Sequence, residues 1–179
     1  MAAEKSDKPS WKNDMALATV LLAVCATFST FKGGGYSTLA LISQTQASDQ
    51  WSFYQAKSLK QHLQELQLEQ LQLQALSLPA HSNAAQTYAQ HITLLQAKLK
   101  KYQKEKAEVK EQAHRLELQR DEAKQHGKPF GRAVIFLQVA ILLNSIAGLL
   151  DIRKVWWTAL PVGLIGVFFF LDGFFLFLG

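Results

Sequence analysis

Three apolar runs constrain the fold of this chain more than any other feature of its sequence. Residues 15–31 and residues 133–150 carry no charge, and residues 155–179 carry only Asp172. A helix rises 1.5 Å per residue, so about 20 apolar residues cross a hydrocarbon layer about 30 Å thick. Each run therefore predicts a transmembrane helix. The first is interpreted as an uncleaved anchor, with a signal peptide as the alternative.

The segment between the first two runs has the opposite character, being rich in Gln, Lys, Leu and Ala. In its second half, apolar or bulky residues recur at alternating intervals of three and four, with Lys106 at one place in the series. This heptad pattern predicts a long helix that packs against another helix. The positions are Ile92, Leu95, Leu99, Tyr102, Val109, Ala113 and Leu116.

The first half of the segment carries a comparable pattern, which predicts the partner helix. Further leucines broaden its apolar face beyond what one antiparallel partner covers, so we expect a second interface, most simply for self-association. The expected packing positions are Ala56, Leu59, Leu63, Leu66 and Leu73, with Gln70 at one core position. The further leucines are Leu68, Leu71, Leu76 and Leu78.

Helix-breaking residues between these two patterns indicate an antiparallel hairpin. Pro79 ends the first helix, and Ser82 or Asn83 can cap the second. Glycines at the two roots, residues 33–35 and Gly127, predict hinges between membrane helices and hairpin arms.

The predicted fold is an all-α membrane protein, with three transmembrane helices and a long antiparallel coiled-coil hairpin inserted between the first and second. Its parts are an N-terminal tail (1–14), transmembrane helix 1 (15–32), the hairpin (33–128, tip near 77–83), transmembrane helix 2 (129–151) and transmembrane helix 3 (155–179).

Polar residues within predicted spans need a physical reason, because charges are costly inside a bilayer. Counted outward from the turn near residue 152, Arg132 and Asp172 lie at the same depth, which predicts a structural ion pair near the membrane boundary. Lys32 is a competing partner, and ion or proton handling by Asp172 is the functional alternative. Gln138 and Asn144 predict hydrogen bonds between helices.

Aromatic residues near the start of the hairpin are candidate interface anchors. Trp51 and Tyr54 are three residues apart on one predicted helix, so their side chains are neighbours. They pack either within the hairpin or in a contact between subunits. The same interface prediction covers Leu95, Leu99 and Tyr102 on the opposite helix.

Pairing residues that are equally distant from the tip brings lysines of both arms together in a basic belt. Its interpretations are a solvated face and a docking surface for an acidic protein or an anionic polymer. Few aromatic residues accompany these lysines, so we expect no nucleic-acid binding. The belt consists of Lys57, Lys60, Lys98, Lys100, Lys101 and Lys104.

No pattern in the sequence predicts catalysis. The 5 histidines form no close pair with metal-ligand spacing, and the single cysteine, Cys25, lies in an apolar run. The glycines at 33–35 are not followed by the Lys-Ser/Thr ending of a phosphate-binding loop. We therefore expect no metal, no cofactor and no enzymatic activity.

The stretches QASDQWSFYQAKSLKQHLQELQ (46–67) and KLKKYQKEKAEVK (98–110) resemble a bacterial membrane protein family called domain of unknown function 4337. In that family a similar Gln-Ala-Ser-Asp-Gln-Trp element follows the first span, and two closely spaced spans finish the protein. The resemblance extends over nearly the whole chain and implies no activity, because the family has none assigned. The His-rich N-terminal stretch associated with relatives is missing here, so a metal role does not carry over.

Positive charges in short segments set the expected orientation. The lysines of the tail share one side with Arg153 and Lys154 of the short turn. We place that side in the cytoplasm, which makes the chain a multi-pass protein of the bacterial inner membrane with a periplasmic hairpin.

The predicted function is a homo-oligomeric coiled-coil scaffold or structural protein, in contact with the lipid bilayer and without catalytic activity. One alternative is a small channel or transporter subunit that uses Asp172, Gln138 and Asn144. The other is an accessory subunit of a larger membrane complex.

Overall fold

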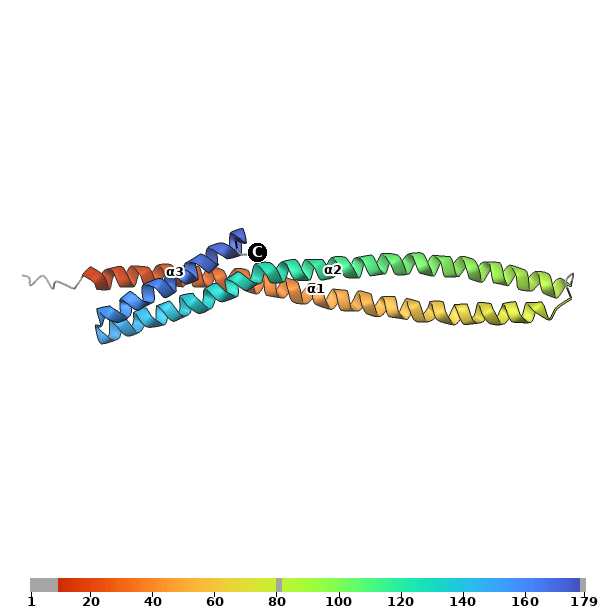
Figure 1. The fold of residues 1–179 in the computed structure, drawn as a ribbon, viewed down its shortest axis with the longest axis horizontal. Coiled ribbons are helices and arrows are strands. Elements are labelled where there is room, and N and C mark those ends of the chain that lie inside the picture. The colour runs from red at the N-terminus through yellow and green to blue at the C-terminus, as the bar shows by residue number, and fades with distance from the viewer. Residues whose placement is uncertain (1–9, 80–81, 178–179) are drawn as a thin grey trace, which may run out of the picture. The chain divides into compact units, whose positions relative to one another are not determined.

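The protein folds as long helices in the computed structural model, which describes residues 10–79 and 82–177. The helices are α1 (Ser10–Leu76), α2 (Asn83–Leu150) and α3 (Arg153–Phe175), and no residue in those two ranges lies in a β-strand (Figure 1). The all-α prediction is confirmed. The expected tail falls partly outside the described residues, and with it Lys5 and Lys8.

Two compact units share these helices. The three-helix unit consists of the chain up to Leu41 and from Arg120 onward, and the helix pair is Ile42–Gln119. The expected hairpin began at residue 33 and ended at residue 128, so the helix pair is shorter than that segment at both ends. The turn between α1 and α2 follows Leu76, where a hairpin tip is expected.

The glycines at 33–35 and at 127 are not hinges, and that prediction is wrong. Residues 33–35 lie inside α1 and Gly127 lies inside α2, and both helices continue through them. A Cβ atom at Gly33 would lie 3.1 Å from the Cβ of Phe130, and one at Gly127 would lie 3.4 Å from the Cβ of Tyr36. The missing side chains therefore allow α1 and α2 to approach closely.

The turn between α2 and α3 is held by backbone geometry and by one ion pair. Asp151 adopts a left-handed conformation with φ 57°, and Ile152 N donates a 3.1 Å hydrogen bond to Ala147 O. This six-to-one bond is that of a Schellman motif, which satisfies a carbonyl at the end of a helix. Lys12 Nζ lies 2.9 Å from Asp151 Oδ2. The start of α1 and the α2–α3 turn thus occupy the same end of the three-helix unit.

Small side chains build the core of the three-helix unit. Ala26, Ala133 and Leu137 form a buried cluster, and a Cβ atom at Gly166 would lie 2.9 Å from the backbone N of Leu137. The outside of the unit remains apolar. In the most apolar 18-residue stretch of each helix, only 11% is buried in α1, and 28% is buried in each of α2 and α3. All three helices are long and apolar enough to cross a membrane, judged by length and composition.

Side-chain contacts in the helix pair establish that α1 and α2 run antiparallel. As residue numbers rise along α1, those of the α2 residues in contact fall, which requires opposite chain directions. Figure 1 shows the two helices of this unit side by side. The contacts are Trp51–Glu117, Gln61–Lys106 and Gln74–Tyr88.

On α2, the buried face of the helix pair follows the predicted heptad positions. Leu95, Leu99, Val109 and Ala113 are between 0% and 8% exposed. The α2 stripe contains a single series of apolar residues at intervals of three and four, so periodicity alone identifies the packing face.

On α1, the predicted packing face is the wrong one. Leu59, Leu63, Leu66 and Leu73 are exposed by 63%, 57%, 62% and 63%. Buried Ala47 and Gln61 mark the face that meets α2, and partly buried Leu68 and Leu71 follow at helical spacing. The physical reason is that α1 carries two apolar stripes, and the one richer in regularly spaced leucine faces away from α2.

Candidate functional site

Trp51 and Tyr54 lie at the contact between α1 and α2. Trp51 Nε1 donates a 2.9 Å hydrogen bond to Glu117 Oε1, and Glu117 Oε2 lies 2.9 Å from His114 Nδ1. The indole ring stands edge-on to Tyr54 and to His114, with ring centroids 5.6 Å and 5.2 Å apart. Of the two interpretations of these aromatics, packing within the helix pair describes this geometry.

A polar layer crosses the middle of the helix pair. Lys57 Nζ donates to Glu105 Oε2 across the pair. Next to it, Lys106 Nζ donates to Gln61 Oε1 at 3.1 Å, and Gln61 Nε2 donates to Glu65 Oε1 at 2.6 Å. Gln61 is only 8% exposed. Because a slip of register would leave these groups without partners, the layer favours one alignment of α1 against α2.

The layer also shifts two carboxyl groups toward their charged forms. The hydrogen bond from Lys57 is the largest cause that lowers the pKa of Glu105 below its ordinary value of 4.5. The pKa of Glu65 is lowered too, first by the hydrogen bond from Gln61 and then by the one from His62. Both carboxylates are therefore ionised at neutral pH.

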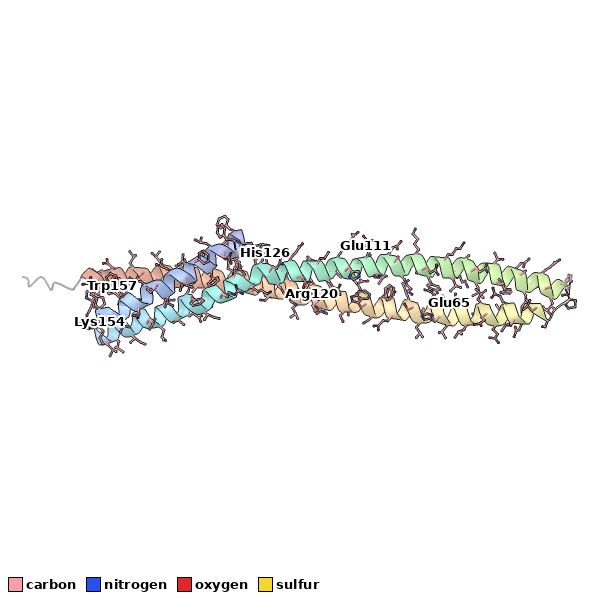
Figure 2. All side chains as sticks on the ribbon, in the orientation of Figure 1. Glu65, Glu111, Arg120, His126, Lys154 and Trp157 are labelled. Atoms are coloured by element: carbon pink, nitrogen blue, oxygen red, sulfur yellow. The ribbon has the colours of Figure 1, made fainter. Side chains whose placement is uncertain are left out.

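Five lysines of the basic belt are exposed, and Lys57 is the exception because it is engaged with Glu105. Lys101 Nζ lies 3.8 Å from Glu105 Oε1, but its side chain is 78% exposed. Figure 2 shows side chains projecting from both helices of this unit, with Glu65 on α1 and Glu111 on α2. The exposed belt can attract anionic groups over about 10 Å at moderate salt. Its exposed members are Lys60, Lys98, Lys100, Lys101 and Lys104.

Arg132 lies close to the turn of α3 that precedes Asp172. The guanidinium carbon of Arg132 lies 5.7 Å from the ring centroid of Phe169, three residues before Asp172 on α3. Arg132 is exposed, whereas Asp172 is 1% exposed.

An apolar cavity of about 210 Å³ lies within the three-helix unit beside Asn144. Asn144 is 2% exposed, and its Nδ2 donates a 3.0 Å hydrogen bond to Thr19 Oγ1. This is the bond between helices expected of Asn144, but its partner was not singled out from the sequence. The only signal is a hydroxyl residue within an apolar run. Gln138 is exposed, so it lies outside this interior.

Cys25 is one of the residues that line this cavity, together with Leu22 and Gly163. Within the part of the chain that the structure describes, no group of three or more His, Cys, Asp or Glu side chains could hold a metal ion. The aromatic contact and the apolar interior serve packing, and the polar layer serves the alignment of α1 with α2. The basic belt presents positive charge at the surface.

The family model for a domain of unknown function (DUF4337) matches residues 11–176. The chain belongs to this family. The match spans both the three-helix unit and the helix pair, so both are parts of the DUF4337 domain. No curated protein matches the chain, and no solved structure matches it.

Proposed function

We propose that this DUF4337 protein is a membrane-anchored, homo-oligomeric coiled-coil scaffold without catalytic activity. The first part of α1, the last part of α2 and α3 cross the bilayer in this proposal, and the helix pair is an antiparallel coiled coil in the aqueous phase. The lipid bilayer and further copies of the chain are its partners.

The continuity of the two long helices carries the proposal. α1 has 67 residues and α2 has 68, and each joins an apolar segment to a polar one without a break. The α1 arm of the helix pair, Ile42–Leu76, rises about 50 Å at 1.5 Å per residue. An anchored helix of this length is suited to presenting binding surfaces along a rod.

Membrane insertion is supported by the outer surface of the three-helix unit. Phe31, Leu149 and Leu164 are 77%, 85% and 69% exposed, and many further apolar side chains of the three helices are exposed with them. Soluble monomers rarely expose apolar patches of more than a few hundred Å². A hydrocarbon layer is the environment that removes such a surface from water.

We place the protein in a bacterial inner membrane with the helix pair in the periplasm. Lys12 and Asp151 pair at one end of the three-helix unit, where Arg153 and Lys154 also lie. Short basic segments favour the cytoplasmic side. The position of Lys12 beside the basic turn supports this orientation.

The polar residues of the spans support a scaffold better than a channel or transporter subunit. Asn144 is engaged with Thr19, Gln138 is exposed, and Asp172 is buried, so the three candidate residues do not share one environment. The exposed lysines of the basic belt favour an accessory role beside an acidic protein as the second candidate function.

Native mass spectrometry of the full chain in mild detergent tests the proposal. We expect a defined homo-oligomer in this measurement. In a second experiment, alkaline washing of native membranes should leave the protein in the membrane fraction. A monomeric particle, or release by alkali, would overturn the scaffold. A heteromeric particle of fixed stoichiometry would favour the accessory role. Asp172→Asn is the control for a channel, because a scaffold keeps its oligomer and a conduit loses flux.

A further inference from the structure

The outward face of α1 in the helix pair carries a complete apolar seam that α2 does not cover. Its residues recur at intervals of three and four, and its four leucines are between 57% and 63% exposed. We call this face the outer seam. It consists of Ala56, Leu59, Leu63, Leu66, Gln70 and Leu73.

The spacing of the outer seam identifies the shape of what covers it. A repeat that averages 3.5 residues keeps a straight line of side chains facing another helix, which inserts its own side chains between them. Charged residues of the same stretch lie off the seam: Lys57, Lys60, Glu65 and Glu69 all occupy other positions. The outer seam therefore has the pattern of a surface that packs against another helix.

We propose that the outer seam pairs with the outer seam of a second copy of this chain, with the two α1 helices parallel and in register. The inference rests on the proposed membrane anchoring. Copies inserted in one membrane with the same orientation present α1 in the same direction, so a symmetric α1 contact is parallel. The resulting order of helices is α2, α1, then α1 and α2 of the partner subunit.

Gln70 favours a second copy in register over any other occupant. With Leu59, Leu66 and Leu73 at heptad position d, Gln70 occupies position a, where a parallel pair sets each residue against its own counterpart. A glutamine amide has donors and an acceptor, so two Gln70 side chains satisfy each other. A shift of one heptad would place Gln70 against Leu63 and leave a buried amide without a partner.

The charges beside the outer seam are compatible with this pairing. In a parallel pair, each g position faces the e position five residues later on the partner helix. His62 then faces Gln67 of the partner subunit, and Glu69 faces Gln74 of the partner subunit. No like charges meet. The outward face of α2 is different, because Leu94 there is followed by exposed Lys98 and Lys101, which would repel their counterparts in a symmetric contact.

Disulfide trapping in native membranes tests the pairing. Cys25 is the only cysteine of the chain, so Cys25→Ala gives a background for single-cysteine variants. Leu66→Cys places a thiol on the outer seam, and Leu94→Cys places one on α2 at similar exposure, 62% and 54% for the native residues. We expect several-fold more disulfide-linked dimer from Leu66→Cys, because facing d positions bring Cβ atoms near disulfide distance. Equal or greater trapping at Leu94→Cys would overturn the inference.

A mass measurement separates this inference from the proposed function. Leu63→Glu with Leu66→Glu should convert the oligomer to smaller particles, whereas the matched Leu94→Glu should not. Circular dichroism should show unchanged helix content in both, because the replaced side chains are exposed. If the parent chain is oligomeric and the seam variant keeps its mass, the outer seam is not the interface and the scaffold stands. If the parent chain is monomeric, the scaffold itself fails.

Discussion

Trp51 Nε1 donates a 2.9 Å hydrogen bond to Glu117 Oε1, although the two residues are 66 positions apart in the chain. The bond joins α1 to α2, and the same carboxylate also meets His114. A hydrogen bond to a charged acceptor is among the stronger ones in a protein. This contact therefore stabilises the helix pair.

Trp51→Phe should destabilise the helix pair, because it keeps an aromatic ring and removes the donor to Glu117. We expect the free energy of unfolding to fall by about 1–2 kcal/mol, since the pair is only partly buried. Chemical denaturation of the full chain, followed by circular dichroism, measures the change. Phe53→Leu is the control, because Phe53 is 51% exposed. An equal loss in both variants would contradict a specific role for the hydrogen bond.

Acid should weaken the helix pair through Glu105. Its pKa is lowered in the folded protein, chiefly by the hydrogen bond from Lys57, from an ordinary value of 4.5. A group with a lowered folded pKa contributes stability above its unfolded pKa and loses it as the pH falls through the folded pKa. The helix pair should thus be stable at neutral pH and lose stability below about pH 4.5.

Thermal unfolding between about pH 6 and about pH 3 measures this dependence. Glu105→Gln is the matched variant, because it keeps an acceptor and cannot titrate. Its melting temperature should vary less with pH than that of the parent chain. The same slope in both proteins would assign the acid sensitivity to other carboxylates, such as Glu65, whose pKa is also lowered.

The sequence was sufficient to predict which face of α2 packs against α1, but it was insufficient to predict which face of α1 packs against α2. Leu95, Leu99 and Val109 lie on the only apolar stripe of their segment, so periodicity identifies them. On α1 the sequence predicted the stripe with Leu59 and Leu63, which is exposed, whereas a long-range polar contact with Lys106 lies on the other face. The spacing of apolar residues does not tell which of two stripes on α1 faces Lys106 of α2.

The same limit applies to the predicted transmembrane segments. Counting along two antiparallel helices brought Arg132 to within one turn of the α3 residue that it contacts, because helical rise is regular. It could not set the direction of the side chain around the helix axis, which places the guanidinium over Phe169. The role of two glycines was also not predictable from the sequence. Gly33 and Gly127 resembled hinges in the sequence, but in the structure they are points of close approach between helices.

Removing the hydroxyl of Thr19 should reveal a weak coupling across the three-helix unit. Asn144 Nδ2 donates to Thr19 Oγ1 at 3.0 Å. Hydrogen bonds between membrane helices are worth about 0.6 kcal/mol on average. A double-mutant cycle of Thr19→Val and Asn144→Leu, measured by unfolding in detergent, should give a coupling energy of this order. Additive effects of the two substitutions would show that the bond contributes nothing.

Gly166→Ala should destabilise the three-helix unit, while Gly34→Ala should not. A Cβ atom at Gly166 would lie 2.8 Å from Leu137 Cγ and 2.9 Å from the backbone N of Leu137, and a backbone atom cannot move aside as a side chain can. Forcing a methyl group into such a contact costs about 1–3 kcal/mol.

At Gly34 a Cβ would meet nothing within 4 Å, and alanine favours a helix over glycine by about 0.5–1 kcal/mol. The melting temperature in mild detergent should therefore fall for Gly166→Ala and stay or rise for Gly34→Ala. Equal decreases would show that helix flexibility, and not close packing against Leu137, is the reason for glycine at position 166.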